Sequence, residues 1–273
     1  MTESRNRVDR YLLVGAGKGG VGKSTVAVNL ALALSRLGAK VGLLDADIHG
    51  PSAQIMLGLQ DSRPTTQGEM ISPVTVHGIS CMSMGLLVEP GQAMIWRGPM
   101  LATVLKQFLD DVAWGALDYL IVDLPPGTGD VPLSIAQTIE DAVALLVSTP
   151  QEVALSDVRK ARAMLDKVGV EVIGLVENMS YFVCPHCNKE TEVFDRGGAE
   201  QAAAEMGLSF LGAIPLLASI RKAGDEGLPS LVAEPDGHVA DSFMEMARKV
   251  TEAFAARPRP KEKTAKPNLK VIQ

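Results

Sequence analysis

The sequence predicts an α/β fold of three layers, in which a mostly parallel β-sheet carries helices on both faces. Short apolar runs rich in β-branched residues alternate with longer amphipathic segments, which is the pattern of repeated strand–helix–strand units. The runs are almost continuously apolar, as strands covered by helices on both sides must be. Apolar residues make up 47% of the 273 residues and aromatic residues only 4%, which indicates a core of aliphatic side chains.

Five strands and five helices are the clearest elements. The expected strands are Tyr11–Ala16, Val41–Asp45, Tyr119–Asp123, Ala142–Ser148 and Val170–Glu177. The expected helices are Lys23–Leu37, Pro99–Val112, Glu152–Val168, Ala199–Met206 and about Val239–Ala255. The last helix has an apolar stripe at helical spacing, which predicts packing on the sheet. A membrane-surface helix is the alternative, and it is disfavoured because the polar face of this helix is mixed in charge.

The chain is expected to form one domain over residues 1–256, followed by a disordered basic tail at 257–273. The formal charge is −6, and the tail holds six Lys or Arg and one Glu, so it carries +5 and the rest carries −11. An acidic body argues against a broad nucleic-acid surface. No apolar run approaches the roughly 20 residues that span a bilayer, and the polar first ten residues do not resemble a signal peptide. We expect a cytoplasmic protein that binds neither nucleic acid nor membrane.

A phosphate-binding loop follows the first expected strand. Gly17, Gly22, Lys23 and Ser24 match G-x-x-x-x-G-K-[ST] between a strand and a helix, where the mechanism requires it. Backbone N–H groups of such a loop and the helix N-terminus attract phosphate oxygens. Lys23 is expected to reach the terminal phosphates of ATP and the Ser24 hydroxyl to bind Mg²⁺, so the sequence predicts an ATPase with the P-loop NTPase fold. The expected nucleotide-binding residues of the loop are Gly17, Lys18, Gly19, Gly20, Val21, Gly22, Lys23, Ser24 and Thr25.

Aspartates follow two further expected strands. Asp45 and Asp47 come after the second strand, and Asp123 ends the third. Because the carboxyl ends of parallel strands meet at one crevice, these side chains are expected beside the phosphate loop. We expect Asp123 to hold Mg²⁺ through a coordinated water, Asp47 to orient the attacking water and Asp45 to support the metal. The loop 124–130 is placed to sense the terminal phosphate, and helix or turn capping is the alternative role for Asp45 and Asp47.

Cys184 and Cys187 form a C-x-x-C pair with Pro and His between them. Spacing alone leaves three interpretations open: a redox dithiol, half of a zinc site or half of an iron–sulfur site. The redox interpretation requires a thioredoxin-like unit, and nothing in the sequence indicates one. Cys81 ends a separate apolar run and is expected in the core. A metal site needs about four ligands, and two chains could supply them across a two-fold axis.

Lys18 is a second lysine inside the phosphate loop, and G-K-G-G-V-G-K-S is the deviant form of the motif. In this feature the chain resembles the deviant P-loop ATPases that include the MinD and ParA proteins. The resemblance implies that Lys18 contacts the nucleotide of a partner subunit across a homodimer. A second cation at the phosphates would stabilise the charge of phosphoryl transfer, as an arginine finger does.

Three further motifs make the resemblance specific: D-A-D-I-H-G-P-S at 45–52, W-R-G-P-M at 96–100 and E-N-M-S-Y-F-V-C-P-H-C at 177–187. With them the chain resembles, over most of its length, the Mrp/ApbC family of iron–sulfur cluster carrier ATPases. The resemblance implies an ATP-binding homodimer that holds a labile [4Fe–4S] cluster between its subunits. Such a carrier passes the cluster to apo iron–sulfur proteins and works with cluster-assembly scaffold proteins.

The same resemblance assigns roles to individual residues. Cys184 and Cys187 become the cluster ligands. Asn178 becomes a contact to the adenine, and the Ile214–Leu217 loop with Pro215 flanks the base. No role is assigned to Arg97.

Two other hypotheses stay open from the sequence. A spatial organiser of the MinD/ParA type fits the phosphate loop equally well, but it does not need the cysteine pair. A zinc-bridged dimeric nucleotide switch would use the same four thiolates, because tetrahedral sulfur ligation suits either metal centre.

Overall fold

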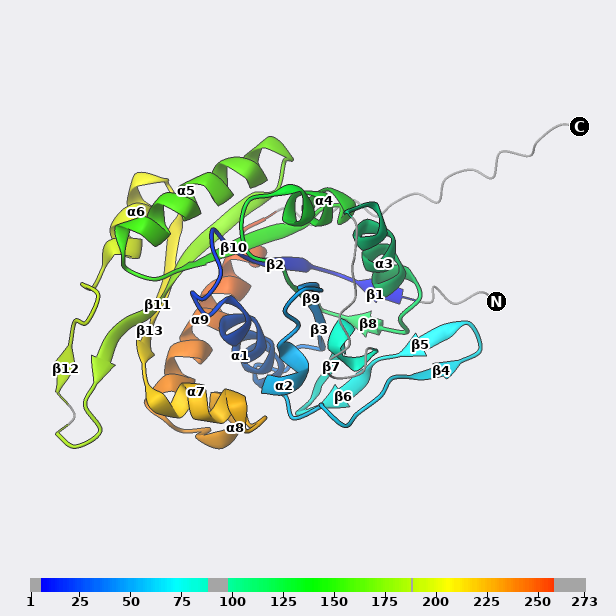
Figure 1. The fold of residues 1–273 in the computed structure, drawn as a ribbon, viewed down its shortest axis with the longest axis horizontal. Coiled ribbons are helices and arrows are strands. Elements are labelled where there is room, and N and C mark those ends of the chain that lie inside the picture. Colours follow the sequence, from blue (N-terminus) through cyan, green and yellow to red (C-terminus); the bar gives the residue numbers. More distant parts are fainter. Residues whose placement is uncertain (1–5, 88–97, 188, 258–273) are drawn as a thin grey trace, which may run out of the picture.

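The structure is a computed structural model, and it describes residues 6–87, 98–187 and 189–257 (Figure 1). Its central sheet has nine strands in the described part of the chain, in the order β12-β11-β10-β2-β9-β3-β7-β6, with β13 also paired to β11. All pairs in this sheet are parallel except β6–β7 and β11–β12. The strands are β2 (Tyr11–Ala16), β3 (Val41–Asp45), β6 (Val74–Val76), β7 (Ile79–Ser83), β9 (Tyr119–Asp123), β10 (Val143–Ser148), β11 (Glu171–Val183), β12 (Glu190–Thr191) and β13 (Ser209–Leu216).

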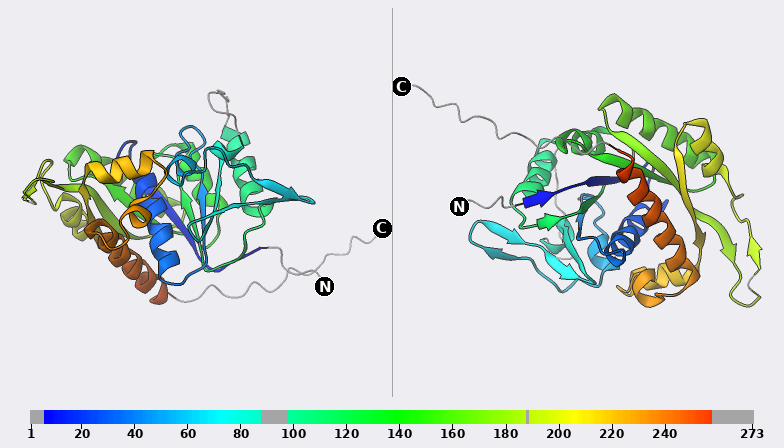
Figure 2. Two further views of the ribbon diagram at one scale, coloured as in Figure 1. Left: turned by 90° about the horizontal axis from the view of Figure 1, so that it is seen from below. Right: turned by 180° about the vertical axis from the view of Figure 1, so that it is seen from behind.

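Helices cover both faces of this sheet, so the predicted three-layer α/β arrangement is confirmed. The face with α1, α7, α8 and α9 has one apolar core, and the face with α3, α4, α5 and α6 has another. Seen from behind, α9 crosses the sheet beside α1 (Figure 2). The helices are α1 (Lys23–Arg36), α2 (Ala53–Met56), α3 (Gly98–Asp110), α4 (Asp130–Thr138), α5 (Glu152–Lys167), α6 (Gly198–Glu205), α7 (Ala218–Asp225), α8 (Ser230–Ala233) and α9 (His238–Ala255), with a 3-10 turn η1 (Met84–Leu86).

The apolar strands divide their side chains between the two cores. On β2, Leu12 and Val14 belong to the core under α1 and α9, whereas Leu13 belongs to the core under α5. Successive side chains of a strand point to opposite faces. A strand buried on both sides therefore needs apolar residues at every position, which is why β2 and β10 read as continuous apolar runs.

The apolar stripe of α9 is buried on the sheet, as predicted. Phe243, Met246 and Val250 have no exposed surface and belong to the core that α9 shares with α1. Because this face is already covered, the membrane-surface alternative for the helix is wrong. In the described part of the chain no helix combines the length and apolarity needed to cross a membrane.

Two small sheets lie outside the central one. Strands β1 (Asn6–Val8) and β8 (Gly115–Leu117) pair in parallel, and β4 (Thr65–Gln67) and β5 (Met70–Ser72) form a hairpin. The β4–β5 hairpin and the hairpin formed by the end of β11 with β12 project from opposite ends of the molecule (Figure 2).

Strand β11 is longer than the sequence predicts. It was expected to end at Glu177, but it continues to Val183 past an irregularity between Asn178 and Phe182, where Met179 has a φ of +56°. A bulge lets a strand bend and continue. The extension carries the chain from the sheet out to the cysteine pair.

The predicted Ile214–Leu217 loop is also wrong in part, because Ile214, Pro215 and Leu216 belong to β13. Asn178 pairs with Ile214 and Phe182 with Leu216, so Pro215 falls at the irregularity. Proline is tolerated in a strand at such a position because no ladder hydrogen bond is required of it. Trp96, Arg97 and the expected basic tail from residue 258 onward lie outside the described residues.

Candidate functional site

The phosphate loop joins β2 to α1 and has the backbone that its glycines predict. Gly20 and Gly22 have φ of +82° and +83°, a region that favours glycine. A Cβ on Gly17 would lie 2.3 Å from the backbone carbon of Asp157 in α5. The loop therefore lies directly on the backbone of α5, and only glycine fits at that contact.

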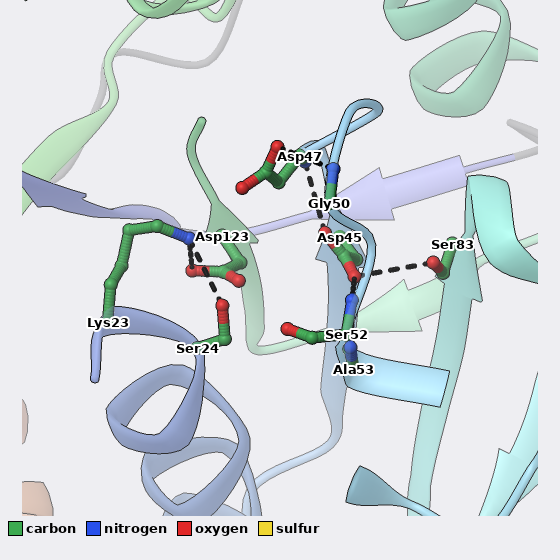
Figure 3. A network of polar contacts seen from close by, with 9 residues as sticks. All are labelled: Lys23, Ser24, Asp45, Asp47, Gly50, Ser52, Ala53, Ser83 and Asp123. Carbon is green, nitrogen blue, oxygen red and sulfur yellow. Dashed lines mark hydrogen bonds and ion pairs between the residues drawn. The ribbon is translucent and has the colours of Figure 1, made fainter. Parts of the chain in front are cut away.

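Lys23 forms a buried ion pair at the foot of the loop (Figure 3). Its Nζ lies 2.6 Å from Asp123 Oδ1 and donates to Ser24 Oγ at 3.2 Å. The two charged side chains are only 6% and 1% exposed. Burial raises the pKa of Asp123, and the charge of Lys23 opposes that rise. In a buried ion pair the cost of desolvation offsets most of the electrostatic attraction. The pair therefore adds little to the stability of the fold, and its role is to place two charged groups beside the phosphate loop.

Asp123 and Ser24 fit a magnesium ion. The second carboxylate oxygen of Asp123, Oδ2, is buried and has no hydrogen-bond donor among the described residues. Buried acceptors are rarely left unpaired, and Mg²⁺ prefers carboxylate oxygen and keeps several bound waters. A water bound to Mg²⁺ would supply the missing donor to Oδ2, with the Ser24 hydroxyl close to Asp123.

Asp45 is fully buried and holds the loop that follows β3. Its Oδ1 accepts the N–H of Asp47 at 3.0 Å, and its Oδ2 accepts those of Ser52 and Ala53 at 2.9 and 3.0 Å. The Ser83 hydroxyl lies 3.3 Å from the same Oδ2 (Figure 3). Protein donors thus surround both oxygens, which favours the capping role, and metal support by Asp45 stays a prediction.

The buried Asp45 carboxyl predicts a pH dependence of stability. Burial, with the nearby Asp123 charge, raises its pKa from 3.8 to about 7. The folded state therefore holds this proton more tightly than the unfolded state, so this contribution to stability is full below about pH 4 and is lost as the pH rises to about 7. Without nucleotide or Mg²⁺, the unfolding free energy should fall more steeply from about pH 5 to 7 in the wild type than in Asp45→Asn.

Urea unfolding at a series of pH values measures this difference. Asp61→Asn, at an exposed position, is the matched control and should keep the wild-type slope. Equal slopes for the wild type and Asp45→Asn would contradict the prediction.

The structure gathers most of the predicted nucleotide residues around one cleft of about 200 Å³. Asp47 lines it from the far side, with its Oδ1 accepting the Gly50 N–H at 3.2 Å. Lys18 lines it too, and it forms no ion pair within the described part of the chain. The predicted roles of Asp47 with water and of Lys18 across a dimer stay predictions. The lining residues are Lys18, Gly19, Gly20, Gly22, Lys23, Ser24, Thr25, Asp47, Ser52, Met56 and Pro126.

Asn178 and Pro215 do not line this cleft. Asn178 is buried behind the loop, where its Nδ2 donates to the Val21 carbonyl at 2.8 Å. A Cβ on Gly22 would lie 2.0 Å from that nitrogen. The structure thus shows Asn178 as a support for the phosphate loop, a contact that the sequence did not indicate, and its predicted contact to adenine stays a prediction.

Cys184 and Cys187 lie at the tip of the hairpin formed by β11 and β12, at one end of the sheet (Figure 1). Cys184 is half-buried and Cys187 is exposed. Hydrogen bonds from the backbone N–H groups of His186 and Cys187 lower the pKa of the Cys184 thiol. No group of three His, Cys, Asp or Glu residues that could hold a metal occurs within the described residues of the single chain, so the pair brings two sulfurs and further ligands must come from elsewhere.

Cys81 is not part of this site. It lies on β7 with no exposed surface, which confirms the predicted core position. Burial raises the pKa of its thiol, since an apolar environment disfavours the thiolate.

Glu177 is a buried residue whose role the sequence analysis missed. Its carboxylate accepts the Ser180 hydroxyl at 2.6 Å and the N–H groups of Gly197 and Ala199 at 3.0 and 2.7 Å. It therefore holds the N-terminus of α6, where a negative charge is favoured. The sequence indicated only that an acidic residue ends an apolar strand. It gave no indication that this residue binds the N-terminus of α6.

Comparisons with known proteins agree with this geometry. The family model described as "ParA: NUBPL iron-transfer P-loop NTPase" matches residues 7–251. The iron–sulfur cluster carrier protein of Synechocystis sp. is 47% identical over 253 residues, covering 91% of this chain and 72% of that protein. The Arabidopsis thaliana iron–sulfur protein required for NADH dehydrogenase, mitochondrial, is 48% identical over 248 residues, covering 90% and 79%.

Solved structures give the same result. A nucleotide-binding protein in complex with ADP from Archaeoglobus fulgidus is 39% identical, with a TM-score of 0.75, and the match covers 86% of this chain and 92% of that one. The cell division ATPase MinD of Pyrococcus furiosus is 25% identical with a TM-score of 0.68, covering 89% and 99%. The fold is that of the MinD/ParA-like P-loop NTPases, and the chain belongs to the NUBPL iron-transfer P-loop NTPase family, as its resemblance to the Mrp/ApbC ATPases implied.

Proposed function

We propose that this protein is an ATP-hydrolysing iron–sulfur cluster carrier. It binds a labile [4Fe–4S] cluster between two copies of the chain and transfers it to apo iron–sulfur proteins. The observation that carries the proposal is strand β11, which contacts the phosphate loop through Asn178 and ends in a hairpin that presents Cys184 and Cys187. Relatives 45–49% identical to this chain are named iron–sulfur cluster carrier proteins.

The nucleotide half of the proposal rests on the cleft beside Lys23. The Lys23 ammonium reaches the terminal phosphates, and Lys18 of each subunit reaches the nucleotide of its partner. Asp47 orients a water for attack on the γ-phosphorus, which breaks the bond to the β–γ bridging oxygen and yields ADP and inorganic phosphate. Ser24 and Asp123 would hold Mg²⁺, which neutralises charge on the phosphates.

The cluster half rests on the cysteine pair. Two chains supply four thiolates, which matches the usual ligation of a [4Fe–4S] cluster. The N–H groups that point at the Cys184 sulfur favour its thiolate form before any metal arrives. The cluster is cargo: the thiolates of a recipient replace those of the carrier without a change in its composition. Nucleotide-dependent movement of Asp47 and of residues 124–130 loosens the two-chain site.

The proposal includes the setting in which the protein acts. The chain forms a single ATPase domain over residues 1–256, works as a homodimer in the cytoplasm and receives clusters from assembly scaffold proteins. The acidic body, with −11 outside the tail, supports a role without nucleic acid, and recognition of apo-proteins needs no membrane.

Anaerobic reconstitution with ferrous iron and sulfide tests the proposal. We expect one [4Fe–4S] cluster per dimer, visible as a brown chromophore, and faster transfer to an apo [4Fe–4S] enzyme with ATP than without it. Lys23→Ala should still take up a cluster but should lose the ATP effect. Lys249→Ala, on the surface of α9 where it pairs with Glu245, should behave as the wild type.

Three results would contradict the proposal. Bound zinc without a chromophore would indicate a structural zinc dimer. A strictly monomeric loaded protein would exclude the two-chain site. Equal transfer by Lys23→Ala and the wild type would exclude coupling to the nucleotide.

A further inference from the structure

One arginine touches both arms of the hairpin that carries the cysteines. The Arg196 guanidinium lies 4.3 Å from the ring centroid of Tyr181, on the β11 arm. Its NH1 lies 2.9 Å from Glu190 Oε2, on the β12 arm. Tyr181 stands three residues before Cys184, and Glu190 stands three residues after Cys187. The same side chain therefore fixes the two arms at equal distances along the chain from the two sulfurs.

Few other contacts join the two arms among the described residues of the hairpin. In the part of the hairpin that the structure describes, Phe182 pairs with Thr191 and Val183 with Glu190, and the Cys184 N–H donates to the Lys189 carbonyl at 3.0 Å. On its other side the β11 arm pairs with β13 as far as Phe182 and Leu216, whereas the β12 arm is the edge of the sheet and pairs with β11 alone among the described strands. A contact that joins the arms from outside the ladder therefore controls how long the tip keeps one geometry.

Arg196 is itself held from the core. The next residue, Gly197, donates its N–H to the buried Glu177 carboxylate, and Ala199 donates to the same group. A Cβ on Gly198 would lie 2.5 Å from the carbonyl oxygen of Pro150, two residues after the end of β10. The turn that carries Arg196 therefore packs tightly against that backbone. Glu177 is adjacent to Asn178, which contacts the phosphate loop. The backbone of Arg196 is thus tied to the part of β11 that supports the nucleotide cleft.

We propose that Arg196 is a positioning residue for the cysteine pair: it holds the hairpin in the geometry that two thiolates need and so slows the loss of the bound metal centre. The proposal rests on the proposed function, because it concerns the same cysteines. The occupant of the site is a thiolate-binding metal ion or an iron–sulfur cluster shared with a second copy of the chain.

A purely stabilising role does not account for this arrangement. Arg196 and Glu190 are 43% and 50% exposed, and an exposed ion pair contributes about 0–1 kcal/mol to folding. The flat guanidinium over the Tyr181 ring instead fixes an orientation, which lysine cannot reproduce. Contacts that directly orient metal ligands typically change metal affinity by about 10- to 100-fold. Arg196 contacts Tyr181 and Glu190 and not the sulfurs themselves, so the lower end of this range is expected. The expected effect is therefore on the metal centre and much less on the fold.

Two measurements on the full-length dimer test the proposal. The first is titration with Co²⁺ alone, followed by the ligand-field absorption of thiolate-bound metal. The second is the rate at which an iron chelator removes the reconstituted cluster. Arg196→Gln should weaken Co²⁺ binding and speed cluster loss by about tenfold, and its unfolding temperature should stay within about 2 °C of the wild type. Arg196→Lys keeps the charge but not the flat group over the Tyr181 ring. Its Co²⁺ affinity and its rate of cluster loss should therefore lie between those of the wild type and Arg196→Gln.

Further variants separate the contact from a general charge effect. Glu190→Gln should also speed cluster loss, and the double variant with Arg196→Gln should be no faster than the faster single variant, since both remove one contact. Tyr181→Leu should speed loss, and Tyr181→Phe should restore slow loss because it keeps the ring. Arg162→Gln removes another exposed arginine–carboxylate pair, with Asp166 on α5, and should match the wild type.

The outcomes distinguish this inference from the function on which it rests. A wild-type protein that binds neither Co²⁺ nor a cluster would overturn the proposed function. A wild type that loads, together with Arg196→Gln that has wild-type affinity and release, would overturn the role of Arg196 alone. Equal effects of Arg162→Gln and Arg196→Gln would also overturn it.

Discussion

Replacing Cys184 or Cys187 with serine is expected to abolish cluster binding while ATP binding persists. Each substitution removes two of the four thiolates of a dimer, and a serine hydroxyl is a poor ligand for iron–sulfur centres. Metal affinity should fall by at least about 100-fold, the upper end of the effect of changes outside the ligand shell. The cysteines lie in the turn between β11 and the edge strand β12, and neither of them lines the nucleotide cleft, so ATP affinity should stay within about twofold of the wild type.

Iron and sulfide analysis after reconstitution, with calorimetric titration of ATP, measures both quantities. Cys81→Ala is the matched control, because this thiol is buried on β7. It should keep full cluster binding and lose about 1 kcal/mol of stability through a small cavity. If a Cys184→Ser dimer retains its cluster, the assignment of Cys184 as a cluster ligand is wrong.

Replacing Lys23 with methionine is expected to lower both the rate of ATP hydrolysis and the free energy of unfolding. Without the ammonium group the terminal phosphates lose a direct charge contact, so ATP hydrolysis should fall by at least about 100-fold. Asp123, only 1% exposed, is left buried without its cation, which typically costs about 3–5 kcal/mol. Protonation relieves part of this cost, so the loss of stability should be smaller at low pH than at neutral pH.

A second substitution separates the two effects. In Lys23→Met with Asp123→Asn neither member of the buried pair carries a charge, so most of the lost stability should return while hydrolysis stays abolished. Phosphate release and urea unfolding at two pH values measure the outcome, and Lys249→Ala serves as the control. If the double variant is no more stable than Lys23→Met, Lys23 does not neutralise Asp123 as the structure indicates.

The local patterns in the sequence were sufficient for most of the sheet and for the phosphate loop. β2, β3 and β9 begin and end where predicted, because strands buried on both faces require unbroken apolar runs. The expected position of Asp45 and Asp123 at one crevice also follows from parallel pairing, and the two residues are direct neighbours in the ladder between β3 and β9.

The short or irregular elements were not predictable in this way. Helix α4 was not predicted because a proline interrupts its pattern within the first turn, although proline is tolerated at such a position in a helix. The extension of β11 was not predicted because it depends on a left-handed backbone conformation at Met179, and methionine rarely adopts that conformation. The contact of Asn178 with Val21 joins residues 157 positions apart, and no local pattern encodes such a distance.

The sequence by itself determined the fold class and the position of the phosphate loop, and it supplied the hypothesis that Cys184 and Cys187 are metal ligands, because each depends on residue type at short spacing. Only the tertiary structure decided what holds them: Asn178 behind the loop, Glu177 at the start of α6 and Arg196 across the hairpin. These are contacts between segments that meet only when the sheet is assembled. Three-dimensional packing determines which residues these side chains contact, and local sequence patterns do not reveal those contacts.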